Sequence, residues 1–192
     1  MKPKLFCETD RLVIRPVTEE DFQVFVSGYR NCYESKNRFD EGSFDTSFMT
    51  PEWFGQLVER RRREADTDYS YMLNIFRKSD GCSVGYCDIT PHRREDFQYA
   101  RIGYTIHNPF WGIGYATECV SAMIQIAFGP LNLHRLEAHV NLDNPASKRV
   151  LLKAGFSFEC IRKAFILEDG MWTDNEVYYI NNDAWSPGKL DI

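Results

Sequence analysis

Three stretches in which apolar and polar side chains alternate follow one another in the middle of the chain. They cover residues 69–77, 83–89 and 97–106, and this alternation predicts strands with one buried face. The first two are joined by the turn sequence Ser79-Asp80-Gly81. Strands joined by so short a turn pair in the antiparallel sense, because a parallel pair needs a crossover of a dozen or more residues. The chain is therefore not a regular series of strand–helix–strand units.

The remaining periodic segments add helices and further strands to this sheet. Helices are expected within residues 18–26, 50–65, 112–128 and 144–155, and strands within 11–15, 134–140, 156–166 and 172–180. Residues 29–49 are irregular and predict a short helix followed by a loop. No repeat or linker divides the 192 residues, so we expect one domain over residues 1–192. The pattern indicates an α/β fold of the α+β type, with a mixed, largely antiparallel twisted sheet of about six or seven strands flanked by helices.

The charge and the apolar runs exclude two classes of partner. The formal net charge is −5, which argues against a protein that coats nucleic acid, because neutralising phosphates needs a basic face. No apolar run approaches the roughly 18–20 residues that span a bilayer. Charged residues interrupt the first eight positions before a signal-peptide stretch can develop. We therefore expect a cytoplasmic protein that binds neither nucleic acid nor membrane.

The cysteines and histidines do not follow a metal-binding pattern. The six cysteines occupy positions 7, 32, 82, 87, 119 and 160, and no two have the C-x-x-C spacing of a zinc site. The four histidines, at 92, 107, 134 and 139, never fall four residues apart as in a helical metal site. We expect reduced thiols and no metal.

The most informative stretch for chemistry is the junction between a strand and a helix at residues 111–118. Gly112 and Gly114 leave backbone N–H groups uncovered by side chains, and the free amides of a helix N-terminus attract a phosphate. An ordinary turn into a helix would carry the same glycines without a ligand. A dinucleotide-binding fingerprint would need a third glycine at position 117, where Thr stands, and an acid at the end of the next strand, where Glu137 lies in mid-strand.

A second group of polar residues opens the short helix after residue 144. Asn144 precedes Pro145, and its amide can cap this helix or face a ligand. Ser147 lies on the first turn and points towards the same helix mouth. Capping with a polar first turn accounts for both residues without any ligand.

Together these two stretches resemble the GNAT superfamily of acyl-CoA-dependent N-acyltransferases, in its ribosomal-protein (RimJ/RimL-like) branch. Gly114 and Ala116 match the superfamily's pyrophosphate loop, whereas Trp111 stands where the superfamily has Arg or Gln. The branch patterns are matched by Gly-Tyr-Ala-Thr-Glu-Cys at 114–119, Leu-His-Arg-Leu-Glu-Ala at 133–138 and Asn-x-Ala-Ser at 144–147. The opening segment 9–16 and the closing hairpin with Asp169-Gly170 also fit, so the resemblance covers roughly residues 8–181.

The resemblance implies a sheet whose central strands splay apart to admit the pantetheine arm of acetyl-CoA, which is the cosubstrate of the superfamily; no metal is implied. The strand at 134–140 would diverge from the strand that ends at Ile106. A backbone N–H near Thr105 or Ile106 would polarise the thioester carbonyl. The residues that the resemblance assigns to acetyl-CoA are Tyr104, Thr105, Ile106, Gly112, Ile113, Gly114, Tyr115, Ala116, Thr117 and Asn144.

The resemblance also assigns the proton transfers. Many superfamily members protonate the departing thiolate with a Tyr at the position of Leu151, which has no acidic group; in this branch Ser147 would substitute as the catalytic residue. The general base of the branch would fall near Ile166, an apolar residue. Glu168 is the nearest carboxylate and Asp88 and Glu137 are further candidates, although a surface or turn charge is the more ordinary interpretation of each, and a water chain could replace them.

Two features of the second predicted helix allow a structural or a functional interpretation. Arg60-Arg61-Arg62-Arg63 is flanked by acids and predicts a solvated helix face, yet one of these arginines could reach the 3′-phosphate of coenzyme A or an acidic substrate. The aromatics Phe39, Phe44, Phe48, Trp53 and Phe54 suit a core, or in part an acceptor pocket over the thioester.

The function that follows is an acetyl-CoA-dependent N-acetyltransferase that transfers the acetyl group directly to a primary amine. A protein N-terminal α-amine is the first candidate, and a small-molecule amine (a polyamine, amino acid or antibiotic) is the second. Two alternatives from other classes are a non-catalytic acyl-CoA-binding module and a nucleotide-binding oxidoreductase. A homodimer through the closing strands is compatible with such a fold.

Overall fold

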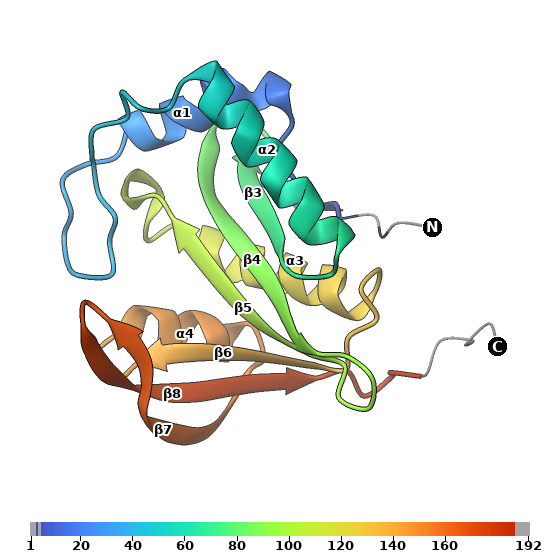
Figure 1. Ribbon diagram of the computed structural model, residues 1–192. Helices are drawn as coiled ribbons and strands as arrows, with labels where there is room; N and C mark the ends of the chain where they lie inside the picture. Colours follow the sequence, from blue (N-terminus) through green and yellow to red (C-terminus); the bar gives the residue numbers. More distant parts are fainter. Residues whose placement is uncertain (1–2, 4, 187–192) are drawn as a thin grey trace.

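A mixed sheet in the strand order β1-β2-β3-β4-β5-β6-β8-β7 forms the centre of the computed structural model, which describes residues 3 and 5–186 (Figure 1). The strands of this sheet are β1 (Cys7–Glu8), β2 (Leu12–Arg15), β3 (Tyr71–Arg77), β4 (Ser83–Arg93), β5 (Tyr99–Ile106), β6 (Arg135–Asn141), β7 (Ser157–Glu168) and β8 (Met171–Asn181). Every neighbouring pair is antiparallel except β5 and β6. The expected fold class is confirmed; the described residues form eight strands because the two-residue β1 adds to the edge beside β2.

Four α-helices cover the two faces of this sheet (Figure 1). They are α1 (Phe22–Arg30), α2 (Pro51–Asp66), α3 (Tyr115–Phe128) and α4 (Pro145–Lys153). The alternating side chains of β2 show how the faces divide. Leu12 and Ile14 join the core under α3, whereas Val13 packs with α1 and α2. In the described part of the chain, no helix is long and apolar enough to cross a membrane.

The starts of α2 and α4 follow from their first residues. Thr50 accepts a hydrogen bond from the Trp53 N–H at 3.2 Å, and Asn144 accepts one from the Ser147 N–H at 3.1 Å. A proline follows each cap, where its fixed backbone angle suits a helix and its missing N–H costs nothing. Both predicted starts are confirmed.

The central strands β5 and β6 part after a short run of pairing. Only Tyr99–Arg101 pairs with Arg135–Glu137, although β5 continues to Ile106 and β6 to Asn141. Figure 1 shows the two strands diverging towards the ends from which α3 and α4 begin. The predicted splay is confirmed, and it leaves strand edges whose backbone groups are free to pair with an inserted ligand.

The connection between α1 and α2 is a long loop over residues 31–50. The prediction of a short helix within 29–49 is wrong beyond Arg30, because the rest of this segment forms turns and bends. The buried Asn108 holds it: its amide oxygen accepts from the Tyr33 N–H at 2.8 Å, and its amide nitrogen donates to Asp40 at 3.0 Å. A side chain distant in sequence thus supplies the order that local periodicity cannot.

Candidate active site

The glycine-rich turn before α3 exposes the amides of a helix N-terminus. Gly112 and Gly114 have φ angles of +80° and +89°, a region that L-residues rarely adopt. Gly114 is the N-cap and its carbonyl accepts the first intrahelical bond, from the Glu118 N–H at 3.1 Å. The N–H groups of the first turn therefore have no partner within the helix. Such a terminus attracts a phosphate through its free donors and its dipole.

Arg11 and Glu118 brace this turn from β2 and α3. The Arg11 guanidinium donates to the Ile113 carbonyl at 2.8 Å and pairs with Glu118 at 2.6 Å. Glu118 also accepts from the Thr9 hydroxyl at 2.5 Å and from the Arg11 N–H at 2.9 Å. Burial raises the pKa of Glu118, but these hydrogen bonds outweigh burial and lower it. The contacts join two motifs that lie far apart in the sequence, and the sequence analysis did not foresee them.

Trp111, which departs from the family pattern, has a structural contact. Its indole N–H donates to the Ile106 carbonyl at 2.6 Å, although its side chain remains partly exposed. The indole thereby ties the turn to the end of β5. The substitution leaves the backbone amides of the turn in place.

Two hydroxyl groups meet across the space between β5 and α4. The Tyr104 hydroxyl lies 2.8 Å from the Ser147 hydroxyl, and burial raises the pKa of Tyr104 to about 12. The two residues were expected to have separate roles, and their contact was not predictable because they are 43 positions apart. Leu151 lies one helical turn beyond Ser147, fully buried in the core, so α4 offers no second hydroxyl there.

Glu137 is a poor candidate for the general base. It is only 4% exposed, so its interpretation as a surface charge is wrong. Its carboxylate lies 2.8–3.2 Å from four polar side chains, those of Tyr99, Arg135, His139 and Arg162. Burial raises its pKa, but the hydrogen bonds and positive charges of these neighbours outweigh burial and lower the pKa to about 2. A carboxylate with so low a pKa binds a proton too weakly to serve well as a base near neutral pH.

Asp88 lies on β4 beside the part of β5 that leaves β6. It pairs in register with Gly103, and a Cβ atom at Gly103 would collide with its carboxylate. Arg101 and Thr90 donate to the same carboxylate oxygen at 3.0 and 2.9 Å. The side chain is 15% exposed, so Asp88 is not an ordinary surface charge either.

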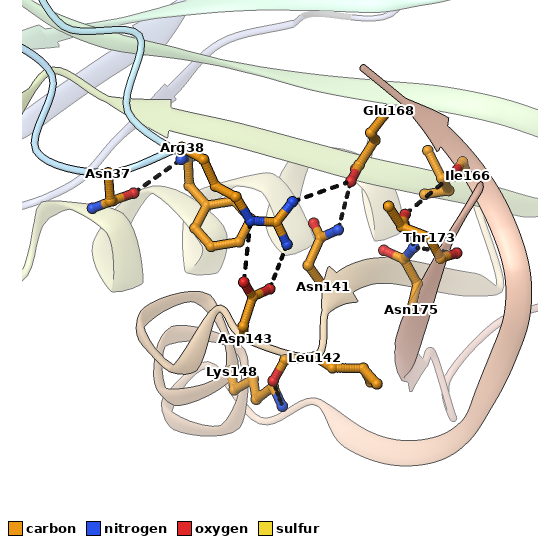
Figure 2. A network of polar contacts seen from close by, with 11 residues as sticks. Asn37, Arg38, Asn141, Leu142, Asp143, Lys148, Ile166, Glu168, Thr173 and Asn175 are labelled. Carbon is orange, nitrogen blue, oxygen red and sulfur yellow. Dashed lines mark hydrogen bonds and ion pairs between the residues drawn. The ribbon is translucent and has the colours of Figure 1, made fainter. Parts of the chain in front are cut away.

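Glu168 ends β7 and faces the far end of β6. The Asn141 amide donates to its carboxylate at 2.6 Å, and Arg38 of the 31–50 loop lies 4.0 Å away (Figure 2). Arg38 also pairs with Asp143 at 2.5 Å, immediately before α4. Figure 2 shows Arg38 between these two acids. Arg38 therefore connects the 31–50 loop to residues near the end of β6, where β6 has parted from β5.

Strand β7 contains a bulge shortly before Glu168. From Arg162 to Ile166 strand β7 advances four residues while β8 advances two, from Asn175 to Thr173. The two extra residues include Ala164, whose φ is +46°. The bulge shifts the register of the pair, so that Ile166 lies opposite Thr173 and Glu168 opposite Met171.

A cavity of about 430 Å³ lies beside α1 and α2. Its walls are mostly aromatic and aliphatic, with one acid and one base: Phe25, Tyr29, Glu41, Phe44, Met49, Trp53, Leu57 and Arg61. Two of the five aromatics that the sequence analysis named, Phe44 and Trp53, thus line a pocket. Phe54 is 1% exposed and belongs to the core.

Within the described residues, no three His, Cys, Asp or Glu side chains lie close enough together to hold a metal ion. The six cysteines are free thiols.

A splayed parallel pair in a mixed sheet, with open amides before the helix that follows, agrees with the fold that the resemblance implies. Residues 11–157 match the model of the family described as "Acetyltransferase (GNAT) domain". The probable N-acetyltransferase YjcK of Bacillus subtilis is 32% identical over 151 residues, which cover 78% of this chain and 83% of that protein. The chain therefore belongs to the GNAT acetyltransferase family and is an acyltransferase.

Solved structures share the fold at lower identity. The ribosomal-protein-S5-alanine acetyltransferase of Vibrio fischeri has a TM-score of 0.75 at 23% identity, covering 95% of this chain and 99% of that one. RimJ of Mycobacterium smegmatis, solved with CoA-disulfide, has a TM-score of 0.73 at 23% identity, covering 90% and 83%. The neighbours thus include members of the RimJ/RimL-like branch. The family assignment also removes the support for a nucleotide-binding oxidoreductase.

Proposed function

We propose that this protein transfers the acetyl group of acetyl-CoA directly to a primary amine, and that a protein N-terminal α-amine is its acceptor. The observation that carries the proposal is the parting of β5 from β6 immediately before the open amides of α3. The first provides strand edges for a pantetheine arm and the second provides donors for a pyrophosphate. A neighbour named for an alanine of a ribosomal protein supports the choice of acceptor.

The residues that would hold acetyl-CoA fit its chemistry. The turn from Gly112 to Ala116, with Ile113, Tyr115 and Thr117 beside the glycines, offers unshielded amides. The β5 segment 104–106 offers backbone groups along the splay, and a Thr105 or Ile106 N–H would polarise the thioester carbonyl. Asn144 uses its amide oxygen to cap α4, which leaves its NH₂ group for the ligand. Acetyl-CoA supplies an activated acyl group, and these residues bind and orient it.

The proton transfers need one acceptor and one donor. Glu168, held by Asn141, would take the proton from the amine as its nitrogen bonds to the carbonyl carbon. Ser147, in contact with the Tyr104 hydroxyl, would pass a proton to the sulfur as the carbon–sulfur bond breaks. Asp88 or a water chain remains the alternative base.

A small-molecule amine is the second candidate acceptor. The cavity beside α1 and α2 favours it, because about 430 Å³ is the size of a small-ligand pocket. A polyamine, an amino acid or an antibiotic would all present a primary amine.

A homodimer through the closing strands is also proposed. Large apolar side chains are exposed at the closed end of the β7–β8 hairpin, those of Leu167, Met171 and Trp172. Exposed apolar clusters of this kind mark association surfaces. Sedimentation of the purified protein measures the oligomeric state.

A thiol-release assay with competing acceptors tests the proposed function. The protein and acetyl-CoA are mixed with peptides whose N-termini are free, and then with polyamines, amino acids and amine antibiotics, with the products identified by mass spectrometry. Acetylation of peptide α-amines in preference to the small amines supports the first candidate. Acetylation of small amines alone supports the second, and acetyl-CoA binding without any thiol release would contradict catalysis.

A further inference from the structure

The arginine run on α2 contains one residue that differs from its neighbours. Arg60 and Arg62 are 63% and 71% exposed and lie 3.9 Å from Glu64 and Glu59, as a solvated helix face predicts. Arg61 turns inward instead and lines the cavity beside α1 and α2. The sequence analysis left open that one of the four arginines meets an acidic substrate.

The Arg61 guanidinium is held without a carboxylate partner. It donates to the Asn74 side chain at 2.9 Å and lies 5.8 Å from the Phe25 ring. Within the described residues no acid lies within 4.0 Å of it. Asn74 is buried and in turn donates to the Ser83 hydroxyl at 3.3 Å. This hydrogen bond holds the Asn74 side chain in place, and Asn74 holds the guanidinium.

The positive charge of Arg61 has no neutralising carboxylate beside it among the described residues, and it lies at the wall of a cavity. Burial lowers the pKa of Arg61, yet an arginine keeps its charge at neutral pH. The one hydrogen bond to Asn74 replaces only part of the hydration that a partly buried charge loses, and no carboxylate in the described part of the chain neutralises the charge. A ligand carboxylate would restore that loss through paired, charge-assisted hydrogen bonds.

A negative charge lines the same cavity. Glu41 lines it, and the Tyr86 hydroxyl donates to the Glu41 carboxylate. The cavity therefore offers a fixed cation and an anion between aromatic walls. A ligand that carries both a carboxylate and an ammonium group complements this pair.

Paired residues on three neighbouring strands relate Arg61 and Glu41 to the expected position of the thioester. Asn74 on β3 pairs with Tyr86 on β4, which pairs with Thr105 on β5. Arg61 is anchored at the first residue of this row and Glu41 at the second. Thr105 ends the row at the strand segment assigned to the thioester. Because strands lie about 4.8 Å apart, the row spans about 10 Å.

We propose that Arg61 binds a carboxylate of the acceptor, so that the acceptor is an amine with a carboxylate within about 10 Å of its reacting nitrogen. Glu41 meets the ammonium group on its way to Thr105. This inference rests on the proposed acetyl transfer. Two sources supply the chemistry: the α-carboxylate of a free amino acid, and an acidic side chain beside a peptide N-terminus.

Direct binding to the CoA-loaded protein tests the inference without turnover. The ligands are two matched pairs: phenylalanine with phenylalanine amide, and Asp-Phe-Ala-amide with Asn-Phe-Ala-amide. Calorimetric titration of the wild type should show at least tenfold tighter binding of the anionic member of one pair. The pair that shows the preference identifies the source. Arg61→Gln should abolish the preference, whereas Arg62→Gln, an exposed change on the same helix, should keep it.

The outcomes separate the inference from the proposed function. Equal binding of both members of each pair by the wild type overturns the inference, and so does equal loss in the Arg61→Gln and Arg62→Gln variants. An anionic preference without thiol release from acetyl-CoA upholds Arg61 as a carboxylate-binding residue, but it contradicts the proposed function and with it the identity of the ligand as an acceptor. Arg61→Lys retains the charge and should retain part of the preference if Arg61→Gln does not fold. If neither variant folds, the wild-type preference decides.

Discussion

The Gly114→Ala variant tests whether the turn before α3 binds acetyl-CoA. Its effect on ligand affinity is compared with the loss of folding stability that backbone strain alone would cause. Gly114 has a φ of +89°, and a Cβ atom there would lie 3.3 Å from the Arg11 guanidinium. An L-residue in this region costs about 1–2 kcal/mol. If the backbone relieves that strain by rotating, the amides after position 114 turn away from the ligand. A Gly114→Val change, with a branched side chain, should act more strongly still.

Gly81 supplies a matched control for this change. Its φ is +70°, it lies in the turn between β3 and β4, and a Cβ atom there meets nothing within 4 Å. Gly81→Ala should therefore lower the free energy of unfolding by a similar amount, about 1–2 kcal/mol, without touching the candidate site. Urea unfolding followed by circular dichroism measures this loss in both variants.

The two variants should differ in their affinity for acetyl-CoA. We expect Gly114→Ala to raise the Kd tenfold or more, equivalent to about 1.4 kcal/mol of binding free energy, and Gly81→Ala to leave it within twofold. Isothermal titration calorimetry measures both. Equal affinities in two folded variants would refute the assignment of the turn as the pyrophosphate site.

Three further predictions concern the candidate acid, the candidate base and the buried acid. Ser147→Ala and Tyr104→Phe should each lower kcat and leave the affinity for acetyl-CoA nearly unchanged. The double variant should lose little more kcat than the worse single variant, because the two hydroxyls share one hydrogen bond. Additive losses of kcat in steady-state kinetics would contradict this coupling. Glu168→Gln should lower kcat/KM about 100-fold as expected for a lost base, and a larger loss in Asp88→Asn would transfer the role. The pKa of Glu137 is lowered from 4.5 to about 2, so its contribution to stability is complete above pH 4.5 and is lost as the pH falls towards 2. The unfolding free-energy difference between wild type and Glu137→Gln should therefore fall by about 3 kcal/mol over that interval, and a difference independent of pH would show that the carboxyl is not held ionised.

The fold was predictable because its information is local. Alternation in 69–77 and 83–89 with a turn between them predicts a hairpin, and Thr50 and Asn144 before prolines mark helix starts. These signals depend on residues within a few positions of one another. The 31–50 loop was not predictable, since its order comes from Asn108, far along the chain.

The candidate site was predictable only where a motif carries the chemistry in its own backbone. Gly112 and Gly114 mark the turn in the sequence, and the structure gives both of them the left-handed backbone that favours glycine. The Tyr104–Ser147 contact joins two elements, and no periodicity reports such a pair. The bulge at Ala164 was not predictable either, because two unpaired residues change the register without any sequence signal as strong as a glycine.

Burial of charged groups was the least predictable feature. Glu137 lies on β6, which has strands on both sides, so its alternation between polar and apolar neighbours did not imply exposure. Arg61 has three arginine neighbours in sequence, and only the helix orientation distinguishes the inward one. Such placements depend on which elements pack together, and a single sequence does not state that.

The most direct test of the account is amine-dependent release of free thiol from acetyl-CoA by the purified protein, after calorimetry has established binding. The account predicts micromolar binding of acetyl-CoA, no binding of NAD, and thiol release that rises with the concentration of a primary amine. Absence of acetyl-CoA binding by the folded protein would contradict the site at the α3 turn and with it the proposed reaction.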